Sequence, residues 1–148
     1  MKKDGNIKKQ VIKSYSIPYG STGQVEAKLR DLVNEIVKLA IKYECSISIE
    51  NLDFTQKKSI LRHFGSKKYN RMLSGFVYSK FRQILVVACE KNGVYVKLIN
   101  PEFTSTIGIF KYAKLHGLSS GFAAAFVIGR RSLGYKEKIN GQARIILK

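Results

Sequence analysis

Glu50 is the residue of this chain whose position points most directly to chemistry. It lies in Ser48-Ile49-Glu50-Asn51-Leu52-Asp53-Phe54, which closes a β-branched run that begins at Cys45. Such a run favours a buried strand, whereas a carboxylate prefers water or a cation. Because ligands and catalytic groups gather at the carboxyl ends of strands in open α/β sheets, Glu50 is a candidate metal ligand of a nuclease-type site. The alternative is a strand that simply runs out into a polar turn.

Other metal-binding residue types lack partners at the required spacing. His63 and His116 have no second ligand four residues further on and no nearby cysteine, so we do not expect zinc binding and interpret both as exposed basic-loop residues. The two cysteines, Cys45 and Cys89, form no CxxC motif and are expected to be buried, reduced thiols.

The charge of the chain indicates a polyanionic partner. Lys and Arg number 27 against 10 Asp and Glu, which gives a formal net charge of +17. Nucleic acid is the commonest partner of so basic a chain, and an anionic membrane surface is the weaker alternative. The stretch Thr55–Cys89 contains no acidic residue. We predict that phosphate contacts come from Lys57, Lys58, Arg62, Lys67, Lys68, Arg71, Arg130 and Arg131.

Hydrophobic periodicity predicts an alternation of strands and helices. The expected strands are Gln10–Pro18, Cys45–Glu50 and Val94–Ile99. The expected helices run from a Ser21-Thr22 cap to Tyr43, and over Tyr69–Lys91, Ile107–His116 and Ser119–Arg131. This order indicates an α/β domain, 1–148, with a mostly parallel sheet and crossover helices. No apolar run approaches the roughly 20 residues of a membrane span, and no apolar core follows Met1-Lys2-Lys3, so we expect a cytoplasmic protein.

A series of motifs gives the chain a family resemblance from about Val11 to Tyr135. The motifs are Ile49-Glu50-Asn51-Leu52-Asp53-Phe54, a long basic helix, Asn92-Gly93-Val94-Tyr95-Val96, Asn100-Pro101-Glu102-Phe103-Thr104-Ser105, and the segment from Gly117 to Arg131. In this order they resemble the RuvC-like nuclease portion of TnpB-type transposon accessory proteins, which are relatives of the type V CRISPR effector nucleases. The last segment resembles the subgroup that lacks the zinc-finger cysteines.

The resemblance implies an RNase H-like (RuvC-like) fold and RNA-guided cleavage of DNA by a trio of Mg²⁺-binding carboxylates. Only the second carboxylate is matched, by Glu50. The strand that should carry the first is absent, because the chain opens at Met1-Lys2-Lys3-Asp4-Gly5-Asn6. Ser120 and Gly121 occupy the place where the third carboxylate is expected, and neither residue can replace a carboxylate ligand.

We therefore expect a truncated, catalytically inactive, transposon-derived remnant that binds DNA and possibly a guide RNA. Without the first strand, the strand at Gln10–Pro18 would have an open edge through which the chain could self-associate or bind a partner fragment. One alternative is a basic structural or ribosome-associated nucleic-acid-binding protein without nuclease ancestry. Another is an active Mg²⁺-dependent nuclease with Asp53 or Asp4 as substitute acid.

Overall fold

The computed structural model describes residues 1, 4–6, 12–13, 15–16, 20–52 and 66–137, with the backbone alone given for 66–74. These residues belong to two compact units. The first unit takes its described residues from 1–11, 48–52 and 97–148, and the second from 12–47 and 53–96. Helices make up 62% of the structure. The prediction of a single domain over 1–148 stays a prediction.

Helix α1 (Thr22–Lys42) of the second unit begins and ends close to where the hydrophobic periodicity places it. Ser21 caps its first turn in a capping box, in which the Gln24 side chain accepts the Ser21 backbone N–H at 3.1 Å. The buried side chains of α1 repeat at intervals of three and four residues: Leu29, Val33, Val37 and Ala40. This spacing puts them on one face of the helix.

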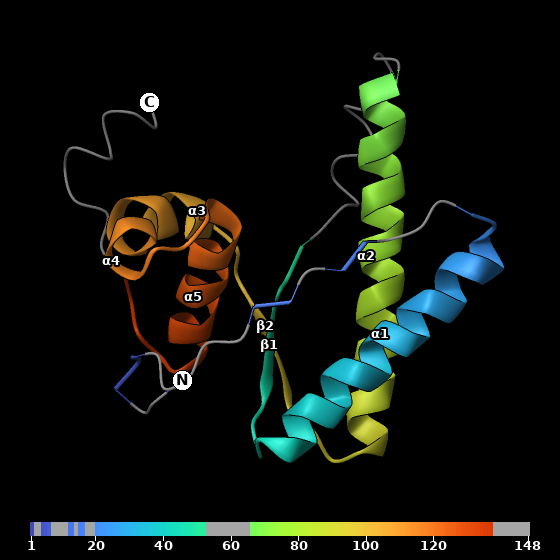
Figure 1. The fold of residues 1–148 in the computed structure, drawn as a ribbon, viewed down its shortest axis with the longest axis horizontal. Helices are drawn as coiled ribbons and strands as arrows, with labels where there is room; N and C mark the ends of the chain where they lie inside the picture. The colour runs from blue at the N-terminus through green and yellow to red at the C-terminus, as the bar shows by residue number, and fades with distance from the viewer. Residues whose placement is uncertain (2–3, 7–11, 14, 17–19, 53–65, 138–148) are drawn as a thin grey trace. The chain divides into compact units, whose positions relative to one another are not determined.

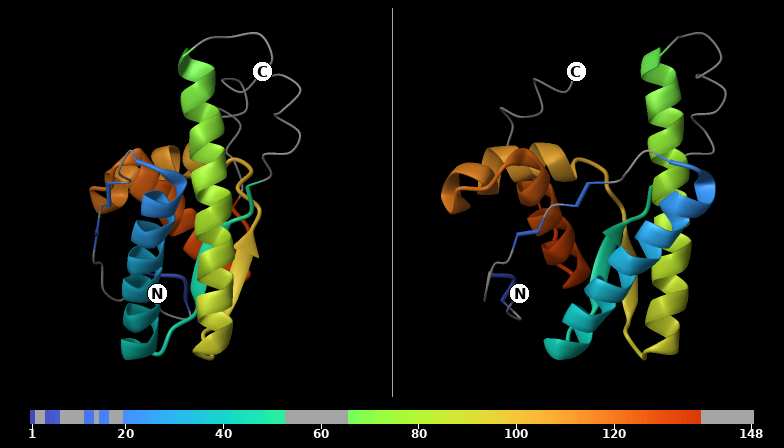
Figure 2. Two further views of the ribbon diagram at one scale, coloured as in Figure 1. Left: turned by 90° about the vertical axis from the view of Figure 1, so that its right-hand side faces the viewer. Right: turned by 45° about the vertical axis from the view of Figure 1, so that its right-hand side comes forward.

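Helix α2 (Ser66–Lys91) packs alongside α1, as the views in Figure 1 and Figure 2 show together. Its buried residues include Val77, Leu85 and Cys89. Lys80 of α2 lies 3.5 Å from the Glu26 carboxylate of α1, so an ion pair joins the two helices beside the apolar contact.

Strands β1 (Ile47–Glu50) and β2 (Val96–Ile99) form a parallel pair, and α2 lies between them in the chain. The Ile47 N–H donates to Tyr95 at 2.9 Å, and the Asn51 N–H donates to Ile99 at 2.8 Å. The pairing therefore advances by four residues on both strands without a slip. The α/β class and the RNase H-like fold both stay predictions.

A helical hairpin follows β2 in the first unit (Figure 1). Its first arm is continuous from α3 (Thr104–Ile107) through a π-helical stretch, η3 (Gly108–Ala113), to α4 (Lys114–His116). Its second arm is α5 (Ser120–Ser132), with Ala123, Phe126 and Val127 among its buried residues. The two arms meet at Gly108, where a Cβ atom would lie 2.6 Å from the backbone carbon of Ala123. Only glycine fits this approach without a shift of one arm.

Four sequence-based expectations can be compared with the described residues. Most of the expected strand Gln10–Pro18 lies outside the described residues, and the residues that are described there belong to no strand. Cys45 is exposed and precedes β1, so the prediction that it is buried is wrong, whereas Cys89 is buried as expected. His116 is half-buried in α4 instead of lying in an exposed loop. None of the helices in the described part of the chain is both long and apolar enough to cross a membrane.

The loop after β2 leads directly into α3 without a side-chain cap. The hydrophobic periodicity predicts that this helix begins at Ile107. Instead the helix begins at Thr104, and its N-cap residue Phe103 has a φ of 57° and makes no side-chain capping bond. The Thr104 hydroxyl is thus available for other partners.

Candidate functional site

Glu50 stands at the carboxyl end of β1, where the sequence places it, and is half-buried. The side chain of Thr104 approaches it from the start of α3, with the hydroxyl oxygen 3.5 Å from Glu50 Oε1. The same hydroxyl lies 2.9 Å from the Pro101 carbonyl oxygen, which is the better acceptor at that distance. Thr104 belongs to the Asn100–Ser105 motif and lies 54 residues after Glu50 in the sequence. The parallel strand pair thus brings Glu50 close to this motif.

Among the described residues, Glu50 is the one carboxylate that matches the metal site implied by the resemblance. A two-ion site of that kind needs several carboxylate oxygens to hold both cations. In the portion of the chain that the structure covers, no three His, Cys, Asp or Glu side chains gather into a possible metal site. Of the substitute acids, Asp53 lies outside the described residues, and Asp4 accepts the Asn6 backbone N–H at 2.9 Å.

The predicted phosphate contacts fall into three groups. Lys57, Lys58, Arg62 and also His63 lie outside the described residues. Lys67, Lys68 and Arg71 lie in the first turns of α2, and only their backbone is described. Arg130 and Arg131 lie in the last turn of α5. Phosphate binding by all of them stays a prediction.

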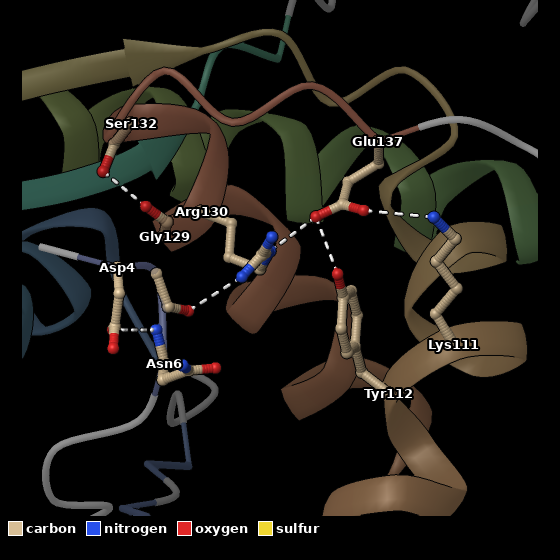
Figure 3. A network of polar contacts seen from close by, with 9 residues as sticks. Asp4, Asn6, Lys111, Tyr112, Gly129, Arg130, Ser132 and Glu137 are labelled. Carbon is tan, nitrogen blue, oxygen red and sulfur yellow. Dashed lines mark hydrogen bonds and ion pairs between the residues drawn. The ribbon is translucent and has the colours of Figure 1, made fainter. Parts of the chain in front are cut away.

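The two arginines of α5 have different surroundings. Arg131 Nη1 donates to the Asn100 carbonyl at 2.7 Å in an exposed position. Arg130, whose side chain is 17% exposed, is held in a polar cluster at the side of the hairpin. We call this group the Glu137 cluster, and it comprises Lys111, Tyr112, Arg130 and Glu137 (Figure 3).

Three side chains donate to the Glu137 carboxylate, as Figure 3 shows. Arg130 Nε lies 2.5 Å and the Tyr112 hydroxyl 2.7 Å from Oε1, while Lys111 Nζ lies 3.2 Å from Oε2. Glu137 is only 4% exposed at its side chain. A carboxylate this deeply buried requires such charge-assisted partners.

Different elements hold the donors in place. Lys111 and Tyr112 are neighbours in η3, and Tyr112 packs edge-on against Phe126 of α5 with ring centroids 4.8 Å apart. The Arg130 guanidinium lies 4.6 Å from the centre of the Tyr135 ring and also donates to the Gly5 carbonyl at 3.0 Å. Gly5 has a φ of +77°, and a Cβ atom there would lie 2.7 Å from Arg130 Nη1, so this contact needs glycine.

The cluster shifts the acidity of its members. Burial raises the pKa of Glu137, but the hydrogen bonds from Arg130, Tyr112 and Lys111 outweigh it and leave the pKa below its ordinary value. Burial, followed by the hydrogen bond to Glu137, raises the pKa of Tyr112 to about 12. At neutral pH the cluster therefore contains one carboxylate, two cations and a neutral phenol.

Little in the sequence indicates this cluster. Lys111 and Tyr112 stand in a polar run with Lys114 and His116, and such a run is compatible with phosphate contact and with a solvent-exposed face alike. Glu137 shares no motif or spacing with them, because it reaches them only after the chain turns back beyond α5. The alternation of Lys and Glu after Tyr135 is the one visible hint, and such patterns are common on surfaces.

Comparison with models of protein families, with curated proteins and with solved structures finds no match to this chain.

Proposed function

We propose that this protein is a nucleic-acid-binding α/β module of RuvC-like descent that does not cleave its ligand. Its partner is DNA, a guide RNA is a further candidate partner, and its place is the cytoplasm. The observation that carries the proposal is the excess of 27 basic over 10 acidic residues. Self-repulsion on that scale is relieved when the chain binds a polyanion.

The distribution of charge along the chain supports nucleic acid as the polyanion. From Ser66 to Cys89, the sequence of α2 contains Lys67, Lys68, Arg71, Lys80 and Arg82 and no acidic residue. Lys80 forms an ion pair with Glu26 of α1. A helix with one sign of charge is suited to follow a phosphate backbone.

The surroundings of Glu50 support binding without cleavage. Glu50 has the hydroxyl of Thr104 close by, and the third carboxylate expected from the resemblance is replaced by Ser120 and Gly121 in the first turn of α5. Neither residue offers a carboxylate to a cation. With so few acids we expect the rate of metal-dependent phosphodiester cleavage to be lost.

A salt titration tests the binding proposal. The affinity of the full chain for duplex DNA, single-stranded DNA and structured RNA would be measured by fluorescence anisotropy at several salt concentrations. We expect log K to fall linearly with log salt, with a slope of about −0.9 for each duplex phosphate contacted. No binding at modest salt, or binding that does not respond to salt, would refute the proposal.

A pair of matched double variants tests where the contacts lie. Lys67→Ala with Lys68→Ala removes two charges from the predicted surface of α2, and Lys28→Ala with Lys38→Ala removes two exposed charges from α1. The α2 variant should make the salt slope shallower by about 1.8, since two contacts are lost, while the α1 variant should leave the slope almost unchanged. Equal losses in the two variants would mean that α2 has no special part in binding.

A cleavage assay tests the catalytic half of the proposal. The protein, incubated with DNA and Mg²⁺ or Mn²⁺, with and without a guide RNA, should leave the DNA intact. Cleavage that disappears in Glu50→Ala but persists in Glu102→Ala would show an active nuclease with a substitute acid, and Asp53 and Asp4 would then be the first residues to test. Cleavage that persists in both variants would indicate a contaminating enzyme.

A further inference from the structure

The Glu137 cluster has the chemistry of a phosphate site that is already occupied by a carboxylate. An arginine, a lysine and a tyrosine hydroxyl converge on the two oxygens of Glu137 over distances of 2.5–3.2 Å. The same three donor types are the ones that bind phosphate oxygens in protein–nucleic acid contacts. Glu137 comes from the segment 133–137 that follows α5, and we call this segment the C-terminal strap.

The strap is tied to the hairpin by backbone hydrogen bonds next to α5, by the Tyr135 ring against Arg130 and by the Glu137 carboxylate. The Gly134 and Tyr135 backbone N–H groups donate to the Arg131 and Arg130 carbonyls at 3.0 and 3.2 Å, which continue the end of α5. Beyond Tyr135, the contacts that the structure gives for the strap are those of Glu137 itself. Lys111 and Arg130 remain 32% and 17% exposed at their side chains, so both are within reach of a ligand from solvent.

We infer that Lys111, Tyr112 and Arg130 form a binding site for a phosphodiester of a nucleic acid, and that Glu137 masks this site in the free protein. The inference rests on the proposed function and adds to it a regulated contact. When a phosphate takes the place of the Glu137 carboxylate, the three donors keep an anionic partner. The exchange keeps one anion against the donors, because the carboxylate becomes hydrated when the phosphate gives up its own water.

The test compares Glu137→Gln with Glu102→Gln in the full chain. Both substitutions remove one negative charge from the first unit, but Glu102 is exposed and lies outside the cluster. With a short fluorescent single-stranded oligonucleotide, Glu137→Gln should bind about tenfold more tightly than the wild type, as expected for one added charge-assisted contact. Its salt slope should steepen by about 0.7, because one more phosphate of the single strand is contacted. Glu102→Gln should change the affinity by no more than about twofold, because its exposed charge is screened.

Substitution of Lys111 identifies the donors. Lys111→Ala should weaken binding more strongly in the Glu137→Gln background than in the wild type, because in the wild type it weakens the masking contact with Glu137 as well as the phosphate contact. Equal affinities of Glu137→Gln and the wild type would overturn the inference while leaving the proposed function intact. Equal gains in Glu137→Gln and Glu102→Gln would also overturn it. If no variant binds any oligonucleotide, it is the proposed function that fails.

A measurement on the wild-type chain covers the case in which Glu137→Gln does not fold. The carboxyl-carbon NMR resonance of Glu137 should move toward that of exposed Glu102 when the oligonucleotide saturates the protein. A Glu137 resonance that stays in place in the complex would overturn the inference. Inorganic phosphate serves as the second probe: if it displaces Glu137 while the bound oligonucleotide does not, the site takes a free anion and the assignment to a phosphodiester is wrong.

Discussion

Replacement of Gly108 by alanine should destabilise the hairpin of the first unit through a single added methyl group. The new Cβ atom would lie 2.6 Å from the Ala123 backbone carbon, 2.7 Å from the Ala124 nitrogen and 2.9 Å from the Ala123 oxygen. All three atoms belong to the backbone of α5, so rotation of a flexible side chain cannot relieve the contact. The two arms must move apart, which would loosen the packing of Ile107 and Val127, both at most 3% exposed.

The size of the effect follows from two opposing contributions. Adding a methyl group to a closely packed contact costs about 1–3 kcal/mol of the free energy of unfolding. Alanine in place of glycine inside a helix returns about 0.5–1 kcal/mol. Since the obstacle at Gly108 is backbone, we expect the upper half of the cost and a net loss of about 1–2 kcal/mol.

Urea unfolding followed by far-UV circular dichroism measures this loss, and Gly121→Ala provides the control. Gly121 lies in α5 of the same hairpin, and a Cβ atom there would meet nothing within 4 Å. Gly121→Ala should therefore leave the midpoint unchanged or raise it slightly. The close approach of the two arms would be refuted if Gly108→Ala were as stable as Gly121→Ala at an unchanged m-value.

Local signals in the sequence predicted most of the helices and strands. The Ser21 hydroxyl and the spacing of the apolar residues located α1, and Asn92-Gly93 and Asn100-Pro101 bounded the strand that is observed as β2. These signals act over a few residues, so they can be read without knowledge of the tertiary structure. The π-helical form of η3 had no such signal, because it arises where Gly108 meets a second helix.

Of the candidate functional residues, only Glu50 could be placed from the sequence, because the end of a strand determines its position. Glu50 follows a β-branched run, and the structure places it at the end of β1 as expected. The partners of Glu137 are 7 to 26 residues away along the chain and come together through the turn after α5 and the packing of the hairpin. Such contacts depend on how the helices and the segment after α5 pack together. Residue types and their spacing along the chain do not show that packing.

Two further predictions use the ionisable groups of the two units. One of the 8 tyrosines should titrate at a pH of about 12 in tyrosinate absorbance, and that late step should vanish in Tyr112→Phe. Folding raises the pKa of Tyr112, so the stabilisation that comes from its neutral hydroxyl is complete below pH 10.0 and is lost as the pH rises toward 12. Tyr112→Phe should therefore flatten the plot of unfolding free energy against pH over this range. In the second unit, a thiol reagent should modify exposed Cys45 quickly and buried Cys89 slowly, because burial both blocks access and raises the pKa of the Cys89 thiol. The Cys45→Ser variant should therefore lose the fast phase alone, and urea should convert the remaining slow phase into a fast one. Fast labelling of Cys89 in the native protein would mean that its thiol is not buried.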